Sequence, residues 1–210
     1  MRKQLNVGKN QDGSIRVYEN PILEFVSHTP VYVPVGLYFL VSGVLLYLAI
    51  AQKALDPIVV TGLFVLGILS FSSLEYLVHR FLFHHPGQKE WQIDLKYKFH
   101  GIHHDNPKDK GRLVMPLPVS ILLACLLFGL FYLLIKTYAY GYLPGVLSGY
   151  SSYLLVHYIV HIYAPPKNFF KILWVNHAIH HYKDEGQVFG VSSPLWDYVF
   201  GTMPKKAKTV

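Results

Sequence analysis

Eleven of the twelve histidines in this sequence lie between residues 79 and 181, where their spacing is that of metal ligands. Residues three and four apart share one face of an α-helix, so an H-x-x-H-H motif presents three imidazoles within an arc of about 100°. Imidazole is a borderline ligand that suits iron, zinc or copper. The spacing therefore predicts a metal site. The histidines form four groups: His79, His84 and His85; His100, His103 and His104; His157 and His161; His177, His180 and His181.

The pair His79 and His84 departs from this pattern, because its members are five residues apart. On a regular helix that spacing is an offset of about 140°, too wide for one face. We therefore expect the helix to end or distort near Phe83, which turns His84 back toward the site. Pro86 and Gly87, which follow directly, favour such a break.

Ten of these imidazoles would repel one another if they were charged, and would serve no packing purpose if they were neutral. A pair of metal ions with five nitrogens each fits their number. His28 stands alone and is interpreted as a structural histidine, and His85 has no partner at ligand spacing of its own. The single cysteine, Cys125, excludes both an intrachain disulfide framework and a cysteine zinc site.

A ligating imidazole also needs an acceptor for its other ring N–H. Glu75 lies four residues before His79, and Asp197 follows the last histidine group. We favour these two as the supporting carboxylates. Three further polar residues near the histidines are interpreted as turn caps or solvated side chains: Asp105, Asn176 and Asp184. No catalytic side chain beyond the metal centre is predicted.

Membrane helices are the elements that must position these groups. Hydrophobic residues make up 52% of the 210 residues and charged residues only 15%, which is not the composition of a soluble globule. Crossing a bilayer takes about 20 apolar helical residues. Four stretches meet this requirement, at about residues 31–51, 57–78, 117–135 and 143–162. Small residues in the fourth, such as Gly145 and Gly149, predict close packing against its neighbours.

The distribution of Lys and Arg predicts the orientation of these helices. Four lie before the first stretch, seven between the second and third, and six after the fourth. By the positive-inside rule, both termini and the long middle segment face the cytoplasm, together with all four histidine groups. The same distribution explains the net charge of +7 without a nucleic-acid partner.

We expect a single domain over residues 1–210. It would consist of a cytosolic N-terminal segment (1–30), a four-helix membrane region (31–163) with a cytosolic insert (79–116), and a cytosolic C-terminal segment (164–210). The polar start of the sequence does not look like a removable signal peptide.

The flanking residues of the histidine groups resemble the fatty acid 2-hydroxylase branch of the membrane fatty acid hydroxylase and sterol desaturase superfamily. The resemblance covers about residues 30–203 and rests on EYLVHRFLFHHPG (75–87), KFHGIHHDNPKDKGRLVMP (98–116), HYIVH (157–161) and NHAIHHYKDEGQVFGVSSPLWDYVFGT (176–202). It implies an all-α integral membrane protein with four transmembrane helices and a cytosolic helical cap that holds two metals. His85 stands where the branch usually has no histidine. The implied ligands are His79, His84, His100, His103, His104, His157, His161, His177, His180 and His181.

The resemblance also implies the activity, which is hydroxylation of a lipid acyl chain, at C2 of a free acid, a thioester or a ceramide N-acyl group. Sphingolipid acyl chains are the favoured substrate and O₂ is the co-substrate. Iron is the expected active metal, although zinc can occupy the site in isolated protein because it outranks ferrous iron in affinity. Many eukaryotic members carry a fused b-type cytochrome domain that this sequence lacks. Electrons are therefore expected from a separate donor, such as a b-type cytochrome or a ferredoxin.

The resemblance places a eukaryotic protein in the endoplasmic reticulum membrane and a bacterial one in the inner membrane. A K-x-K-x-x ending at Lys206 and Lys208 has the form of a retrieval signal. Two alternatives stay open: a sterol or carotenoid hydroxylase or lipid desaturase of the same superfamily, and a metal-handling membrane protein. A transporter would hold its ligands near the membrane midplane, whereas these histidines gather at one rim.

Overall fold

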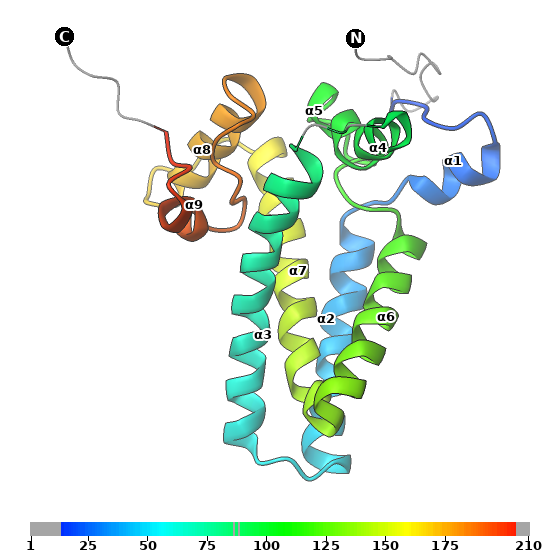
Figure 1. The fold of residues 1–210 in the computed structure, drawn as a ribbon, viewed down its shortest axis with the longest axis vertical. Helices are drawn as coiled ribbons and strands as arrows, with labels where there is room; N and C mark the ends of the chain where they lie inside the picture. The colour runs from blue at the N-terminus through cyan, green and yellow to red at the C-terminus, as the bar shows by residue number, and fades with distance from the viewer. Residues whose placement is uncertain (1–13, 86, 88, 205–210) are drawn as a thin grey trace.

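The structure is a computed structural model, and it describes residues 14–85, 87 and 89–204. The regular elements of this described part are all helices, and the longest of them run side by side (Figure 1). The predicted retrieval signal at Lys206 and Lys208 lies outside the described residues, as do residues 1–13 of the predicted cytosolic N-terminal segment.

Three stretches are long and apolar enough to cross a membrane: Tyr32–Gln52, Pro57–Phe83 and Leu117–Ile162. The first consists of α2 (Tyr32–Tyr47) and the π-helical turn η1 (Leu48–Gln52), and the second of α3 (Pro57–Leu77) and the π-helical turn η2 (Val78–Phe83).

The third stretch contains two helices, α6 (Leu117–Ile135) and α7 (Ala139–Ile162), joined by the 3₁₀ turn η4 (Lys136–Tyr138). The chain reverses at Lys136, which has a φ of 52°, and α6 and α7 pack side by side (Figure 1). The four predicted stretches agree with these helices to within a few residues, except that α7 begins at Ala139 rather than near residue 143.

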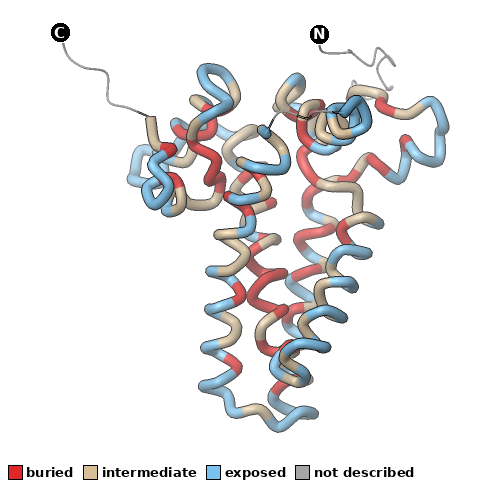
Figure 2. Tube along the Cα trace, viewed as in Figure 1, coloured by how far each residue is buried: buried red, intermediate tan, exposed pale blue. Residues whose placement is uncertain are grey.

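Helix α7 is the centre of the bundle and packs against α2, α3 and α6. Most of its buried residues lie in the first half of the helix, and red segments mark the middle of the bundle in Figure 2, whereas the outer faces of the surrounding helices are largely exposed. A Cβ atom on Gly145 would lie 2.0 Å from the Phe64 carbonyl oxygen, and one on Gly67 would lie 2.3 Å from the Tyr142 carbonyl oxygen. Only glycine allows α3 and α7 to approach this closely, which confirms the predicted close packing of the fourth stretch.

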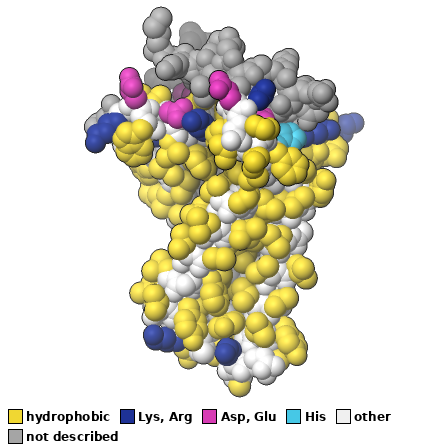
Figure 3. All heavy atoms as spheres, turned by 90° about the vertical axis from the view of Figure 1, so that its right-hand side faces the viewer, with side chains coloured by type: hydrophobic (Ala, Val, Ile, Leu, Met, Phe, Trp, Pro, Cys, Tyr) yellow, Lys and Arg dark blue, Asp and Glu magenta, His cyan; other side chains and the backbone are white. Residues whose placement is uncertain are grey.

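The short helices lie together at one end of the bundle (Figure 1). They are α1 (Pro21–Ser27), α4 (Glu90–Lys96) with the π-helical turn η3 (Tyr97–Gly101), α5 (Ile102–Asp105), α8 (Lys171–Tyr182) and α9 (Leu195–Phe200). Charged side chains are visible at the two ends of the molecule in Figure 3, whereas hydrophobic side chains cover the shaft between them.

Two of these short helices, α1 and α9, turn their apolar side chains outward. Phe25 of α1 is 82% exposed and Val199 of α9 is 61% exposed, whereas the carboxylates of Glu24 and Asp197 are buried. The Glu24 carboxylate pairs with the Arg112 guanidinium, which anchors α1 to the segment that precedes α6. This polarity is the reverse of that of a helix on a water-soluble surface.

Candidate metal centre

The structure brings the ten predicted histidines together in two groups of five. Within each group, one nitrogen atom from every residue lies within 4.8 Å of the others. Site A contains His79, His84, His100, His104 and His180, and site B contains His103, His157, His161, His177 and His181. His28 and His85 belong to neither group. The assignment of the ten as ligands stays a prediction, but each group could hold a metal ion.

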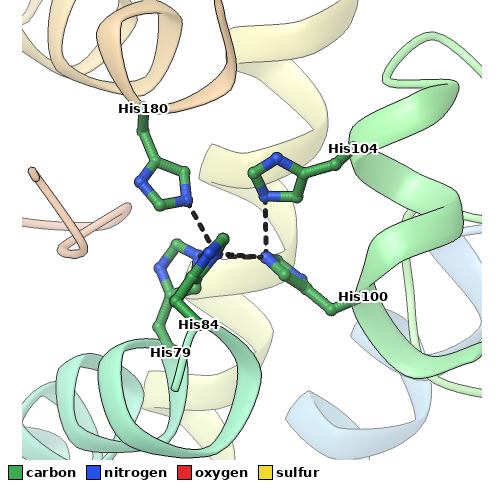
Figure 4. A group of neighbouring side chains, drawn as sticks. All are labelled: His79, His84, His100, His104 and His180. Atoms are coloured by element: carbon green, nitrogen blue, oxygen red, sulfur yellow. Dashed lines mark hydrogen bonds between the residues drawn. The ribbon is translucent and has the colours of Figure 1, made fainter. Parts of the chain in front are cut away.

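In site A, the five rings point toward a common centre (Figure 4). The Nε2 atom of His84 lies 3.2 Å from that of His79, 3.1 Å from that of His100 and 3.0 Å from that of His180. Two nitrogens bound at right angles to one ion, each at an ordinary distance of about 2.0–2.1 Å, are themselves about 2.9 Å apart. The observed spacing therefore fits a shared metal ion.

Site B has the same character. The Nε2 atoms of His103 and His157 lie 2.9 Å apart, and those of His161 and His177 lie 2.6 Å apart. The His181 ring stacks on the His104 ring of site A with centroids 4.1 Å apart, so the two sites adjoin. The residues of both groups fit a pair of neighbouring metal ions.

The two H-x-x-H-H motifs are each divided between the sites. His100 and His104, four residues apart, lie in site A, whereas His103 between them lies in site B. The second motif is divided the other way, because the i, i+4 pair His177 and His181 lies in site B and His180 lies in site A. Each site thus combines two close pairs with one single histidine, and the two motifs link the sites to one another.

The π-helical turn η2 explains how His79 and His84 reach one site. The His84 N–H donates to the His79 carbonyl oxygen over 3.2 Å, which closes a turn of five residues instead of four. A pair at i, i+5 therefore meets on one face. The predicted distortion of the helix near Phe83 is confirmed, and it occurs as a wider turn at the end of α3.

Backbone carbonyls fix the tautomers of two site A histidines. Nδ1 of His79 donates to the Phe189 carbonyl oxygen over 2.5 Å, and Nδ1 of His180 donates to the Gln187 carbonyl oxygen over 2.8 Å. A carbonyl can only accept, so Nδ1 carries the proton and Nε2 presents its lone pair to the centre of site A.

Residues 187–193, which we call the carbonyl loop, are held by the two carboxylates singled out in the sequence. Asp197 accepts from the Phe189 and Gly190 N–H groups, over 2.8 Å each. Glu75 accepts from the Val191 N–H over 2.7 Å, and from the Ser192 N–H and hydroxyl. Neither carboxylate accepts an imidazole N–H itself. Each supports site A indirectly, because it holds the main-chain loop whose carbonyl groups accept the imidazole N–H groups.

Val188 lies between the two acceptor carbonyls and has a φ of 50°, a region that β-branched residues rarely adopt. It is buried, and its N–H donates to the Thr202 carbonyl oxygen over 3.0 Å. The other polar candidates have local partners: Asp105 accepts from the Tyr97 hydroxyl, Asn176 contacts the Met203 sulfur, and Asp184 accepts from the Gly186 N–H and the Gln187 amide.

Glu185 is a site residue that the sequence did not reveal. Its carboxylate lies 3.9 Å from Nδ1 of His84 and 3.7 Å from Nδ1 of His104, which is too long for a direct hydrogen bond. Burial, reinforced by neighbouring His180, lowers the pKa of His84 to about 3, so His84 is neutral and this contact is not an ion pair. Glu185 follows the last histidine motif directly beside Asp184, and nothing in its spacing distinguishes the two.

The electrostatic environment keeps the imidazoles in the form that binds metals. Burial, with a further contribution from His157, lowers the pKa of His103 and of His177 well below the ordinary value for histidine. The same two causes, burial and a neighbouring imidazole, lower the pKa of His100, where the neighbour is His79. Neutral imidazoles are the state in which histidine ligates metals.

Apolar helices of membrane length, together with two groups of five imidazoles, define a histidine-rich membrane metalloprotein. The fatty acid hydroxylase family matches residues 64–202. The dihydroceramide fatty acyl 2-hydroxylase FAH2 of Arabidopsis thaliana is 34% identical over 196 residues, which cover 90% of this chain and 80% of that protein. The chain belongs to the fatty acid hydroxylase family, and it is a hydroxylase.

Two further comparisons agree. The fatty acid 2-hydroxylase of Homo sapiens is 36% identical over 218 residues, covering 91% of this chain but only 58% of the human protein. A solved structure of full-length scs7p, in which only the hydroxylase domain is visible, has a TM-score of 0.83 and 32% sequence identity to this chain. That similarity covers 91% of this chain and 73% of the scs7p chain.

Proposed function

We propose that this chain is a di-metal monooxygenase that hydroxylates C2 of the fatty acyl chain of a lipid. The observation that carries the proposal is the convergence of ten imidazoles into two adjoining groups of five. The relatives above are named fatty acid 2-hydroxylases, and one is named for dihydroceramide, which supports the C2 position and the N-acyl chain of a sphingolipid as substrate.

Two iron ions bound in sites A and B would supply the activation of O₂ that side chains alone cannot achieve. In the overall reaction, one oxygen atom enters the C–H bond and the other leaves as water, while a separate donor provides two electrons, one at a time, and the solvent provides two protons. A b-type cytochrome or a ferredoxin suits this role. Zinc would find the same nitrogen ligands, so its presence in isolated protein would not identify the native metal.

The chain's own residues supply the ligand field and its rigidity. His79 and His180 direct their Nε2 lone pairs at site A because Phe189 and Gln187 hold their other nitrogens. The Phe83 ring stacks on His100 with centroids 4.8 Å apart, and the Tyr153 ring stacks on His157 with centroids 5.5 Å apart. These rings exclude water from the edges of the two sites.

We further infer four membrane spans, with α6 and α7 crossing separately, and a cytosolic cap that carries both sites. The lengths of α6 and α7 support this topology, as does the concentration of Lys and Arg outside the tight connections. The outward apolar faces of α1 and α9 suit the boundary between lipid tails and headgroups. The membrane would be the endoplasmic reticulum in a eukaryote and the inner membrane in a bacterium.

Two experiments test the proposal. Purified protein loaded with iron should convert an acyl lipid into its 2-hydroxy product when it is supplied with a reductant and O₂. Cells with this chain should accumulate 2-hydroxy acyl lipids that cells without it lack. Iron-loaded protein that forms no hydroxylated product would contradict the oxygenase function, and an oxidised sterol or an unsaturated acyl chain would favour the superfamily alternatives.

A further inference from the structure

A cavity of about 370 Å³ opens beside site A. Its walls include the ring of His84 together with Arg80, Phe81, Glu185 and Phe189. His84 is one of the five site A imidazoles, and the Glu185 carboxylate that lines the cavity with it lies 3.9 Å from its Nδ1, so the cavity adjoins site A at the outer edge of the His84 ring. It has the size of a ligand pocket rather than of a packing defect.

Arg80 is held in this wall with most of its donors unused. Its Nη1 donates to the Tyr76 hydroxyl over 2.8 Å, and its guanidinium carbon lies 5.0 Å from the Phe81 ring centroid and 5.8 Å from that of Phe189. A guanidinium carries five N–H donors. Among the described residues, the Tyr76 hydroxyl is its one hydrogen-bond acceptor, and no carboxylate lies within ion-pair distance. Arg80 is therefore pre-oriented for an acceptor that the protein does not provide.

The position of Phe189 relates Arg80 to the metal centre. Its ring centroid lies 5.8 Å from the ring centroids of both His79 and His84, while the Arg80 guanidinium lies against the same ring. The Arg80 guanidinium and the rings of His79 and His84 are thus neighbours of one aromatic ring, that of Phe189. The Glu185 carboxylate in the same cavity opposes a second negative charge, which favours an uncharged carbonyl over a free carboxylate.

We propose that Arg80 binds the carbonyl oxygen of an amide- or ester-linked acyl chain and thereby places C2 beside site A. The inference rests on the acyl hydroxylase function proposed above, and it adds the residue that sets the reacting position. C2 is the carbon directly bonded to the carbonyl carbon, so fixing the carbonyl oxygen fixes C2. A substrate held by its tail alone would present several carbons to the metals.

The test is a binding measurement on the metal-loaded protein in vesicles of neutral, ether-linked phosphatidylcholine, which carries no acyl carbonyl group. Two uncharged probes are compared, a long-chain acyl methyl ester and the corresponding alkyl methyl ether, which lacks only the carbonyl oxygen. Wild type and the R80Q, R80K and K98Q variants are measured side by side. K98Q is the matched control, because Lys98 pairs with Asp94 at the surface and its replacement removes one positive charge at a distance from the cavity.

Wild type and K98Q should prefer the carbonyl-bearing probe by about tenfold to a hundredfold, the range for one hydrogen bond to a charged donor. R80Q should lose this preference while it retains both metals. R80K keeps the positive charge but not the planar arrangement of N–H donors, and should retain part of the preference for the carbonyl-bearing probe. If R80Q fails to retain metal, R80K alone decides, and an unchanged probe preference in R80K would overturn the proposal.

Turnover provides a second readout that a merely structural role would not change. In R80Q and R80K, the hydroxyl group should spread from C2 to C3 and beyond, and KM should rise more than kcat falls. If R80Q weakens both probes equally, Arg80 does not recognise the carbonyl oxygen, and the proposal is wrong. Because binding needs no oxidation, an inactive wild type that still prefers the carbonyl probe would refute the proposed function and leave the role of Arg80 intact.

Discussion

Replacing Asp197 with asparagine tests whether the carbonyl loop holds site A in place. The Asp197 side chain is fully buried, and both of its oxygens accept main-chain N–H groups, from Phe189 and from Gly190. Its Oδ1 also accepts the Thr202 hydroxyl over 2.6 Å. Asparagine has the same shape but offers only one oxygen. In either orientation of the amide, an NH₂ group must face a main-chain N–H.

The loss of stability expected for Asp197→Asn follows from these contacts. Leaving a buried donor unsatisfied costs about 1–3 kcal/mol, and hydrogen bonds to a charged acceptor are worth about 1.5–3 kcal/mol. We expect Asp197→Asn to lower the free energy of unfolding by about 2–4 kcal/mol. The displaced loop also carries the carbonyls that orient His79 and His180. The affinity of site A for metal should therefore fall about ten- to a hundredfold, as is typical when a supporting hydrogen bond to a ligand is lost.

The matched control is Glu75→Gln. Glu75 Oε1 accepts both the Val191 and Ser192 N–H groups, and Oε2 accepts only the Ser192 hydroxyl. Glutamine keeps the first oxygen, and its NH₂ can donate to the hydroxyl after a simple rotation. This variant should lose less than about 1 kcal/mol. Thermal unfolding in detergent, combined with the rate of metal loss to a chelator, measures both effects. Equal behaviour of the two variants, or unchanged metal retention in Asp197→Asn, would refute this reasoning.

Three other predictions concern pH, membrane depth and helix packing. The pKa of His84 is lowered to about 3, so below pH 6.5 the unfolded chain binds more protons than the folded one. The metal-free protein should therefore lose about 1.4 kcal/mol of stability per pH unit, as the pH falls below 6.5, for each such histidine. Thermal unfolding at pH 7.5, 6 and 5 measures this loss, and a midpoint that did not fall with pH would contradict it. With the exposed native thiol removed by Cys125→Ser, fluorescent labels at Phe25→Cys and Val199→Cys should be quenched by spin-labelled lipid and not by aqueous iodide, and the reverse result would place α1 and α9 in water. Gly145→Ala should destabilise the bundle by about 1–3 kcal/mol because its Cβ meets backbone atoms of α3. Gly129→Ala on α6, whose Cβ meets open space, should leave the melting temperature the same or raise it slightly.

The apolar stretches and the histidine spacings predicted most of the architecture. Helix ends near residues 52, 57, 117 and 135 could be read from charged residues and prolines at the edges of apolar runs. The sequence places the start of α7 too late, near residue 143, because Gly141 looks like a residue before a helix. In the structure, Gly141 lies within the first turn of α7, where it packs close to Leu63 of α3.

The partition of the histidines could not be predicted from their spacing. An arc of three imidazoles on one helix predicts that they act together, but His103 and His180 each point across to the opposite site. That choice depends on how α5, α7 and α8 meet in space. The hydrogen-bond acceptors for His79 and His180 could not be predicted either, because they are main-chain carbonyl groups, which every residue has.

Anomalous diffraction from crystals of the iron-loaded protein, recorded above and below the iron absorption edge, would locate the metals directly. Two iron peaks per chain are expected, one among the five imidazoles of site A and one among the five of site B. A single peak, or peaks outside both groups, would contradict the assignment of the ten histidines to a two-metal centre.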